Sequence, residues 1–481
     1  MPVDGARARR WQFRRTRATD GMKRYFFGHG PRAIAAFVCY IVNGTKQRAK
    51  NLLDRELERS RLSRRDRDLA TELVFGCLRR RGTLDQVLGA FSRRPVRRIQ
   101  ARLLEVLRVG AYQLLFLDKV PPAAAVNEAA RCAGRVSSKA GVGFVNACLR
   151  ALARAIRGKD DKPPEDPRTA IPLGDGLWCH LDRPVLPDPT SDQAGFLAAA
   201  HSHPRWLVER WLARFGHEET TRLLEHDNRA PAVVLRVNRL RARRHELLDH
   251  LAREGHWGKP LGEGHVALDH RGSVAGLAPL RQGLCTVQGV AASEAARLLG
   301  PRPGEMILDL CAAPGSKTAQ LAELSGDQAT VVAVDNSLDR LRLVAQNAQR
   351  LGLRSIRPIA ANASRCGEVL ATRFDAVLLD APCSNTGVLA RRAECRWRLS
   401  PETIERLAEV QKQLLAAAAR ALKPGGRLVY STCSLEPEEN ERVVESVCSR
   451  RRELRVVESR YLLPTQTNDD GGYVALVRHE G

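Results

Sequence analysis

Beyond residue 299, the sequence alternates short apolar runs with segments of helical pattern. The runs are Met306 to Leu310, Thr330 to Val334, Ile356 to Ala360, Phe374 to Leu379, Arg427 to Tyr430 and Tyr473 to Val477. Strands that alternate with helices form a mostly parallel sheet, because each parallel pair needs a crossover connection that a helix can supply. We therefore predict an α/β domain with a doubly wound, mostly parallel sheet over residues 299–481.

Two cysteines follow neighbouring strands of this predicted sheet. Cys383 lies in residues 380–384 (Asp-Ala-Pro-Cys-Ser), and Cys433 lies in residues 430–434 (Tyr-Ser-Thr-Cys-Ser). Ligands of open α/β sheets bind just beyond the carboxyl ends of the strands, so both thiols are expected to face one cleft. A single free cysteine is usually a small buried hydrophobe. The pair, in these contexts, indicates covalent chemistry on a pyrimidine ring.

The first predicted strand leads into a turn of small residues. Residues 308–318 are Leu-Asp-Leu-Cys-Ala-Ala-Pro-Gly-Ser-Lys-Thr, and Asp335 follows the next strand. Small residues let the backbone approach a ligand closely, and an acidic residue at this spacing commonly binds ribose hydroxyls. The turn is neither the Gly-x-Gly-x-x-Gly of nicotinamide sites nor a P-loop, which favours S-adenosylmethionine. Tight packing of strand against helix is the alternative interpretation.

The chain is long enough for several domains, because one core rarely serves 481 residues. We divide it into a basic arm without clear apolar periodicity (1–30), a helical domain (31–157), a Pro-rich linker (158–193), a small α+β subdomain (194–298) and the sheet domain (299–481). The linker is inferred from its dense prolines, with acidic residues between them. In the subdomain we expect helices over 204–215 and 243–254, with a strand over 233–237.

Helical spacing is clearest within residues 31–157. Leu103, Leu107, Ala111 and Leu114 fall on one helix face. Ser63 followed by Asp66 predicts the start of a helix, because these residues resemble a helix-capping pair.

The net charge indicates a polyanionic partner. The formal charge is +24 and the pI is about 10.2, and basic surfaces bind phosphate backbones through counterion release. The alternative is an arginine-rich composition that only loads solvated helix faces. Apolar runs stay shorter than the roughly 18 residues of a membrane span, and the N-terminus lacks a secretion signal. The 12 cysteines form no Cys-x-x-Cys, so we expect a cytoplasmic protein without zinc or disulfides.

These residues closely resemble the RNA 5-methylcytosine methyltransferase family, and within it the bacterial small-subunit ribosomal RNA branch called RsmB, Sun or Fmu. The matching segments are 308–318, 380–388 followed by Arg391, Arg392 and Trp397, and 424–426 continuing into 430–440. Segments 67–74, 81–85 and 143–150 resemble the NusB-like RNA-binding domain of that branch. The resemblance extends over nearly the whole chain after residue 30. It implies a Rossmann-like methyltransferase domain, preceded by an all-α NusB-like domain and a small α+β subdomain.

The resemblance also implies a role for each matching residue. Cys433 is the nucleophile that attacks carbon 6 of cytosine, Asp380 contacts the base edge, and Cys383 acts in product release. Lys317 is expected to orient Asp380. The expected residues around S-adenosylmethionine are Cys311, Ala312, Ala313, Pro314, Gly315, Ser316, Lys317, Asp335, Asn362 and Asp380. The expected RNA contacts are Arg391, Arg392 and Arg398, and no metal site is expected.

The implied activity is methylation of carbon 5 of a specific cytosine in 16S ribosomal RNA. The expected enzyme is a monomer that acts on the unassembled or partly assembled small subunit, away from any membrane. Two alternatives stay open: the same chemistry on transfer RNA, and a catalytically weak RNA-binding factor. The fold by itself does not settle the substrate.

Five residues depart from the family pattern. Ser316, Asn362, Asn385 and Gly289 stand where the family commonly has Gly, Asp, Gly and Asp, and Gly472 stands in place of the usual aromatic residue. Asn362 can still accept a hydrogen bond but lacks the charge of a carboxylate and the stronger bond that goes with it. Cofactor affinity is therefore the property that we expect to differ most.

Overall fold

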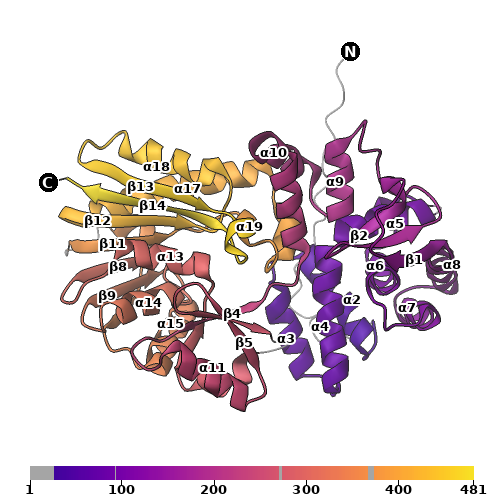
Figure 1. Cartoon of the computed structure of the whole chain (residues 1–481), viewed down its shortest axis with the longest axis horizontal. Coiled ribbons are helices and arrows are strands. Elements are labelled where there is room, and N and C mark those ends of the chain that lie inside the picture. The colour runs from indigo at the N-terminus through magenta and orange to yellow at the C-terminus, as the bar shows by residue number, and fades with distance from the viewer. Residues whose placement is uncertain (1–26, 93, 270–273, 367–372, 481) are drawn as a thin grey trace. The chain divides into compact units, whose positions relative to one another are not determined.

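The structure is a computed structural model that describes residues 27–92, 94–269, 274–366 and 373–480. It divides into two compact units, residues 1–228 and residues 229–481 (Figure 1). The basic arm predicted over 1–30 lies outside the described residues, apart from residues 27–30.

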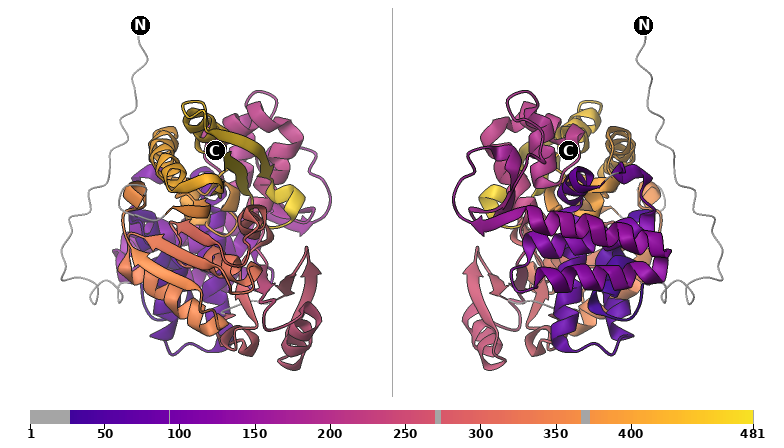
Figure 2. Two further views of the ribbon diagram at one scale, coloured as in Figure 1. Left: turned by 90° about the vertical axis from the view of Figure 1, so that its left-hand side faces the viewer. Right: turned by 90° about the vertical axis from the view of Figure 1, so that its right-hand side faces the viewer.

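The first unit begins with helices that share an apolar core. They are α2 (Pro31–Gly44), α3 (Ala49–Glu58), α4 (Arg64–Arg79), α5 (Arg81–Phe91), α6 (Ala101–Phe116), α7 (Pro122–Val136) and α8 (Lys139–Ala155), with the 3-10 helix η2 (Val96–Arg98). Helix α6 contacts α2, α7 and α8 (Figure 2). Its predicted apolar face, from Leu103 to Leu114, is buried. Helix α4 begins where predicted, because the Ser63 hydroxyl accepts a hydrogen bond from the Asp66 N–H at 3.2 Å.

Residues 158–193 differ from the expected linker, because they contain regular structure. Strands β1 (Ile156–Asp160), β2 (Ala170–Gly174) and β3 (Leu177–Leu181) form an antiparallel sheet in the order β1-β3-β2, and the 3-10 helix η3 (Pro167–Thr169) precedes β2. Ile171 and Cys179 are buried in it. Pro172 is tolerated because β2 is an edge strand. The other prolines of the region lie in the segment between β1 and β2 and in the loop after β3.

The first unit also extends further than the predicted boundary at residue 193. Helices α9 (Gln193–His201) and α10 (Arg205–Asn228) belong to it. The Thr83 hydroxyl of α5 donates to the Ala199 carbonyl at 2.7 Å, and the Ser202 hydroxyl accepts from the Gly82 N–H at 2.8 Å. These bonds attach α9 to α5.

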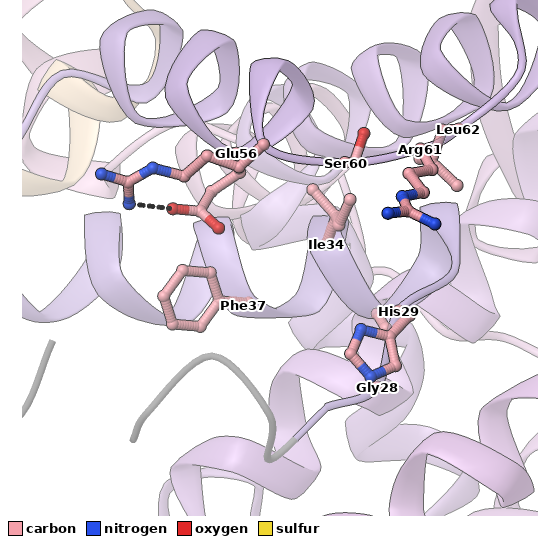
Figure 3. Close-up of a pocket in the computed structure, with 10 residues that line it drawn as sticks. Gly28, His29, Ile34, Phe37, Glu56, Ser60, Arg61 and Leu62 are labelled. Atoms are coloured by element: carbon pink, nitrogen blue, oxygen red, sulfur yellow. Dashed lines mark ion pairs between the residues drawn. The ribbon is translucent and has the colours of Figure 1, made fainter. Parts of the chain in front are cut away.

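A cavity of about 450 Å³ lies within the first unit. Its lining combines the apolar side chains of Ile34, Phe37 and Leu62 with the charged Glu56 and Arg61, as Figure 3 shows. None of the predicted site residues lines this cavity.

The second unit starts with a small antiparallel sheet. Strands β4 (Val233–Val237), β5 (Trp257–Leu261), β6 (His265–Asp269) and β7 (Cys285–Val287) run in the order β5-β6-β4-β7. Helix α11 (Arg244–Arg253) covers one face, with η4 (Val274–Gly276) and α12 (Ala278–Arg281) beside it. The predicted strand over 233–237 and the predicted helix over 243–254 are confirmed.

The main sheet of the second unit has the predicted doubly wound form. Its strands are β8 (Met306–Leu310), β9 (Thr330–Asp335), β10 (Ile356–Ala360), β11 (Phe374–Asp380), β12 (Leu422–Thr432), β13 (Leu454–Leu462) and β14 (Gly472–His479). The order is β10-β9-β8-β11-β12-β14-β13, parallel as far as β12 and antiparallel at β14 and β13. Each predicted strand is present, and β13 is an additional one.

Helices cover both faces of this sheet (Figure 1). Helices α13 (Val290–Leu299), α14 (Ser316–Leu324) and α15 (Leu338–Leu351) lie on one face, and α17 (Pro401–Arg420) and α18 (Glu441–Cys448) lie on the other. Shorter helices are η5 (Ala363–Arg365), η6 (Thr386–Val388), η7 (Ala393–Arg398), η8 (Pro437–Glu439) and α19 (Pro464–Thr467). Ile307 faces the first helix layer and Leu308 the second, as strand alternation requires.

The strand order brings three chain segments together at the carboxyl ends of the central strands. β8 and β12 are the two neighbours of β11, and all three strands are parallel. Asp380 pairs in register with Ser431. The turn after β8 and the two cysteine segments therefore leave the sheet side by side, at the edge where open α/β sheets bind ligands.

Candidate active site

The two predicted cysteines lie against each other. Cys383 follows the end of β11 and Cys433 follows the end of β12, and their Sγ atoms are 3.0 Å apart. The prediction that the two thiols lie together is confirmed. A hydrogen bond with Cys433 raises the pKa of Cys383 well above its usual value, and burial and the proximity of Cys433 raise it further. Cys383 is therefore held in its protonated thiol form as long as Cys433 is not bonded to a substrate.

Lys317 and Asp380 form an ion pair beside the cysteines. Lys317 is in the first turn of α14, and its Nζ lies 2.8 Å from Oδ2 of Asp380, the last residue of β11. The Ser431 hydroxyl donates to Oδ1 at 2.8 Å. Burial lowers the pKa of Lys317, but the Asp380 carboxylate outweighs burial and the net pKa is raised. A charged lysine therefore pairs with Asp380.

The turn over 311–317 brings its backbone close to helix α15. Cys311 and Gly315 both have positive φ, +62° and +99°. A side chain at Gly315 would bring its Cβ within 3.1 Å of the Val344 Cα, so only glycine fits there. Asp335, at the end of β9, is buried next to the turn, and its Oδ2 accepts from the Ala313 N–H at 3.4 Å. Arg340 pairs with the same carboxylate at 3.2 Å.

Asn362 lies two residues after β10 and is exposed. Its Oδ1 accepts hydrogen bonds from the Ser364 N–H at 3.1 Å and from the Ser364 hydroxyl at 2.9 Å. The side chain thus caps η5 through its oxygen, and its amide N–H groups take no part in these two bonds.

Two residues near the site were not predicted to act there. Asp309 of β8 is buried, and its Oδ2 accepts from the Thr318 hydroxyl at 2.6 Å. Burial raises the pKa of Asp309 to about 7. Asn385 accepts a bond from the Cys433 thiol at 3.4 Å through Oδ1, and its amide donates to the Cys383 carbonyl at 2.8 Å. The only sequence signals are a carboxylate within an apolar strand and an Asn in place of the common Gly.

The predicted RNA contacts have different surroundings. Arg391 pairs with Asp469 and Asp470, at 2.7 Å in each case, and donates to the Ala232 carbonyl at 2.8 Å. The Arg392 guanidinium donates to Oδ1 of Asn385 at 3.1 Å. Arg391 therefore holds the 469–470 turn against the start of the subdomain, while Arg392 reaches the cysteine segment.

The departure at Gly289 is explained by the same turn. A Cβ at Gly289 would lie 2.4 Å from Oδ2 of Asp469. This carboxylate accepts from the Val290 N–H at 2.6 Å, at the N-terminus of α13. Asp469 thus supplies from another segment the carboxylate that the family pattern has at residue 289.

Comparison with known proteins identifies the family. The probable ribosomal RNA small subunit methyltransferase B of Bacillus subtilis (strain 168) is 33% identical over 400 residues, which cover 82% of this chain and 83% of the relative. A family model described as 16S rRNA methyltransferase RsmB/F matches residues 296–478. The chain belongs to the RsmB/F family. The resemblance stated from the sequence is confirmed.

Further matches agree with this RsmB/F assignment. A NusB family model matches residues 29–154, and a model for the ferredoxin-like domain of RsmF/B-like proteins matches residues 203–274. The probable ribosomal RNA small subunit methyltransferase B of Synechocystis sp. is 34% identical, over 93% of this chain and 96% of its own. A methyltransferase homolog protein from Pyrococcus horikoshii has a TM-score of 0.53 and 28% identity, over 59% of this chain and 97% of its own.

As an RsmB/F protein, the chain is an RNA methyltransferase, and its methyl donor is S-adenosylmethionine. The 311–317 turn fits this cofactor by its place, because it follows the carboxyl end of β8 beside the buried carboxylate of Asp335, where open α/β sheets bind ligands. Within the described residues, we find no helix long and apolar enough to cross a membrane and no His, Cys, Asp and Glu cluster suited to a metal ion.

Proposed function

We propose that this RsmB/F protein methylates carbon 5 of a specific cytosine in 16S ribosomal RNA through a covalent adduct with Cys433. The observation that supports this most strongly is the pair of sulfur atoms 3.0 Å apart, next to the ion pair of Lys317 and Asp380. The names of the relatives from Bacillus subtilis and Synechocystis support ribosomal RNA as the substrate.

Covalent attack would activate a carbon that is otherwise a poor nucleophile. The Cys433 thiolate adds to carbon 6 of cytosine, a C–S bond forms, and the displaced electron pair makes carbon 5 nucleophilic. Asp380 pairs in register with Ser431, two residues before Cys433, and would hydrogen-bond the base edge around nitrogen 3 as charge develops there. Lys317 and Ser431 each bond one oxygen of this carboxylate and so fix its orientation.

Release of the product needs a base at carbon 5. When the proton on carbon 5 is removed, its electron pair forms the 5,6 double bond and expels the Cys433 thiolate. We assign assistance in this step to Cys383. The hydrogen bond and the charge of Cys433 keep the pKa of Cys383 raised, and both are lost once Cys433 is bonded to the base. Adduct formation therefore lowers the pKa of Cys383 when a base is needed.

When bound, S-adenosylmethionine supplies an electrophilic methyl group. Residues 311–317 would hold its methionine and ribose, Asp335 the ribose hydroxyls, and Asn362 the adenine. Because Arg340 already pairs with Asp335, this arginine would also be close to the ribose.

The RNA would be bound by basic surface on both units. The target base must leave its stack to meet the Cys433 thiol, so an unpaired or loop cytosine suits the site. A net charge of +24 favours phosphate contacts. The NusB-like helices would recognise RNA shape, and Arg392 and Arg398 would contact the strand near the site. We propose a monomer acting on unassembled or partly assembled small subunits.

Transfer of labelled methyl from S-adenosylmethionine tests the proposal. The substrates are ribosomal RNA and, separately, transfer RNA; the variants are Cys433→Ala and Cys383→Ala, with Cys448→Ala of α18 as the matched control. We expect labelled 5-methylcytosine in ribosomal RNA alone, no label with Cys433→Ala, a trapped protein–RNA adduct with Cys383→Ala, and normal transfer by the control. Label at another base position or atom, or an active Cys433→Ala, would refute the mechanism.

A further inference from the structure

Each cysteine of the pair is followed by a serine, and both serines bond to one buried carboxyl group. Ser384 donates its backbone N–H to Oε1 of Glu439 at 2.8 Å and its hydroxyl to Oε2. The Ser434 hydroxyl donates to the same Oε2. Glu439 is the last residue of η8 and is fully buried. The carboxyl group therefore joins the segment after β11 to the segment after β12.

Two further elements hold Glu439 in place. Gln411 of α17 donates Nε2 to Oε1 of Glu439 at 3.1 Å and to the Pro382 carbonyl at 2.9 Å. The Tyr430 hydroxyl of β12 donates to the Glu439 carbonyl at 2.5 Å. Burying a carboxyl group is costly unless it is fully hydrogen-bonded, so an apolar residue would serve better if packing were the only requirement.

Backbone pairing alone does not hold the two sulfurs together. The β11–β12 ladder has its last register pair at Asp380 and Ser431. Beyond it, the two segments are joined directly by the Ala381 N–H to the Ser431 carbonyl at 2.9 Å, the Gly387 N–H to the Cys433 carbonyl at 3.0 Å and the Leu435 N–H to the Thr386 hydroxyl at 2.8 Å. Glu439 adds a buried side-chain bridge at the residue that follows each cysteine.

We propose that Glu439 is a positioning residue that sets the separation of Cys383 and Cys433. The effect of Glu439 on methyl transfer rests on the proposed function, whereas its effect on the distance between the two sulfurs does not. Attack by one sulfur and assistance from the other require both to reach the same base, and a misplacement of about 1 Å can cost about 100-fold in rate. Glu439 touches neither sulfur, and acts through Ser384 and Ser434.

The separation can be measured without the methyl-transfer reaction. Phenylarsine oxide bonds two neighbouring thiols, forming two As–S bonds and releasing water, so its affinity reports whether both sulfurs can reach one arsenic atom. The full chain is compared with Glu439→Ala and Glu439→Gln, and Cys383→Ala defines the background. Glu323→Gln is the matched control, because Glu323 is equally buried in the second unit but bonds to Arg236.

The two Glu439 variants have different expected results. In Glu439→Gln, the amide oxygen can accept from the Ser384 N–H and Gln411, while the amide N–H groups donate to the serine hydroxyls, so arsenical affinity is retained. In Glu439→Ala, arsenical affinity falls by about 100-fold, because the second As–S bond is lost. Methyl transfer falls by about 100-fold as well, and calorimetry detects unchanged affinity for S-adenosylmethionine.

Glu439→Ala with wild-type arsenical affinity would overturn the inference, as would an equal loss in Glu323→Gln. If Glu439→Ala does not fold, Ser384→Ala combined with Ser434→Ala removes the two hydroxyl donors to Glu439, together with the acceptor of the Glu436 N–H, and carries the same expectation. If the wild-type protein transfers no methyl group to RNA, the proposed function fails, while the arsenical comparison still decides the role of Glu439.

Discussion

Asp309 gives the second unit a dependence on pH that a single substitution should remove. Its carboxyl group lies within β8, 1% exposed, and accepts one hydrogen bond from Thr318. The other oxygen, Oδ1, has no hydrogen-bond partner among the described residues. Burial raises the pKa of this group from 3.8 to about 7. In Asp309→Asn, the side chain keeps a similar shape but cannot ionise.

The sign and size of the effect follow from proton linkage. Between about pH 4 and pH 7 the unfolded chain loses the Asp309 proton while the folded chain keeps it, so stability falls as pH rises. Above the folded pKa both states are ionised and the loss is complete. About three pH units at about 1.36 kcal/mol each give a loss of about 4 kcal/mol. Asp309→Asn avoids this loss, so its gain in stability over wild type should be about 4 kcal/mol near pH 8 and roughly 1.5 kcal/mol near pH 5.

Urea denaturation at several pH values measures the free energy of unfolding. Limited proteolysis of the protein at each urea concentration, followed through the peptides that contain β8 and β11, reports on the second unit. Asp375→Asn is the control, because Lys423 and the Met306 N–H bond Asp375 and its pKa is lowered. Above about pH 5, the free energy of unfolding of this control should differ from that of wild type by a constant amount. A pH slope in Asp309→Asn equal to the wild-type slope would refute the reasoning.

Three further predictions concern other contacts. Asn385→Gly should fold normally, because the backbone at residue 385 has a φ of +67°, which glycine adopts readily. The variant should speed alkylation of Cys433 by iodoacetamide, because the Cys433 thiol loses its hydrogen-bond acceptor; an unchanged rate would contradict this. Arg236→Met leaves Glu323 buried without its partner and should cost about 3–5 kcal/mol by urea denaturation, most of it recovered when Glu323→Leu is added. Ser63→Ala removes the N-cap of α4 and should cost about 1 kcal/mol in thermal unfolding.

Apolar strands were predictable from the sequence, and the edges of the fold were less so. The strands β8, β9 and β11 carry nearly continuous apolar runs because helices cover both of their faces. β13 was not predicted, because it is an edge strand whose residues are mostly exposed. The strands within 158–193 were not predicted, because prolines flank them. A proline-rich composition is found both in linkers and in the loops of small sheets with short strands.

The site could be predicted as far as local motifs reach. Cys383, Cys433 and Lys317 each follow or begin a recognisable element, and strand order then brings them together. Glu439 and Asn385 act through contacts with segments 55 and 48 residues away. No local pattern marks such contacts, because a glutamate after a strand is usually a solvated surface residue.

The parallel neighbours β11 and β12 make the cysteine pair tolerant of some insertions and intolerant of others. The two sulfurs are 50 residues apart in sequence, and α17 occupies 20 residues of that interval. Residues added to the loop that enters α17 change chain length without changing the ladder. One residue added within β11 would turn every later side chain of that strand to the opposite face. Length variation among relatives should therefore concentrate between the two motifs, and stop at the strands that carry them.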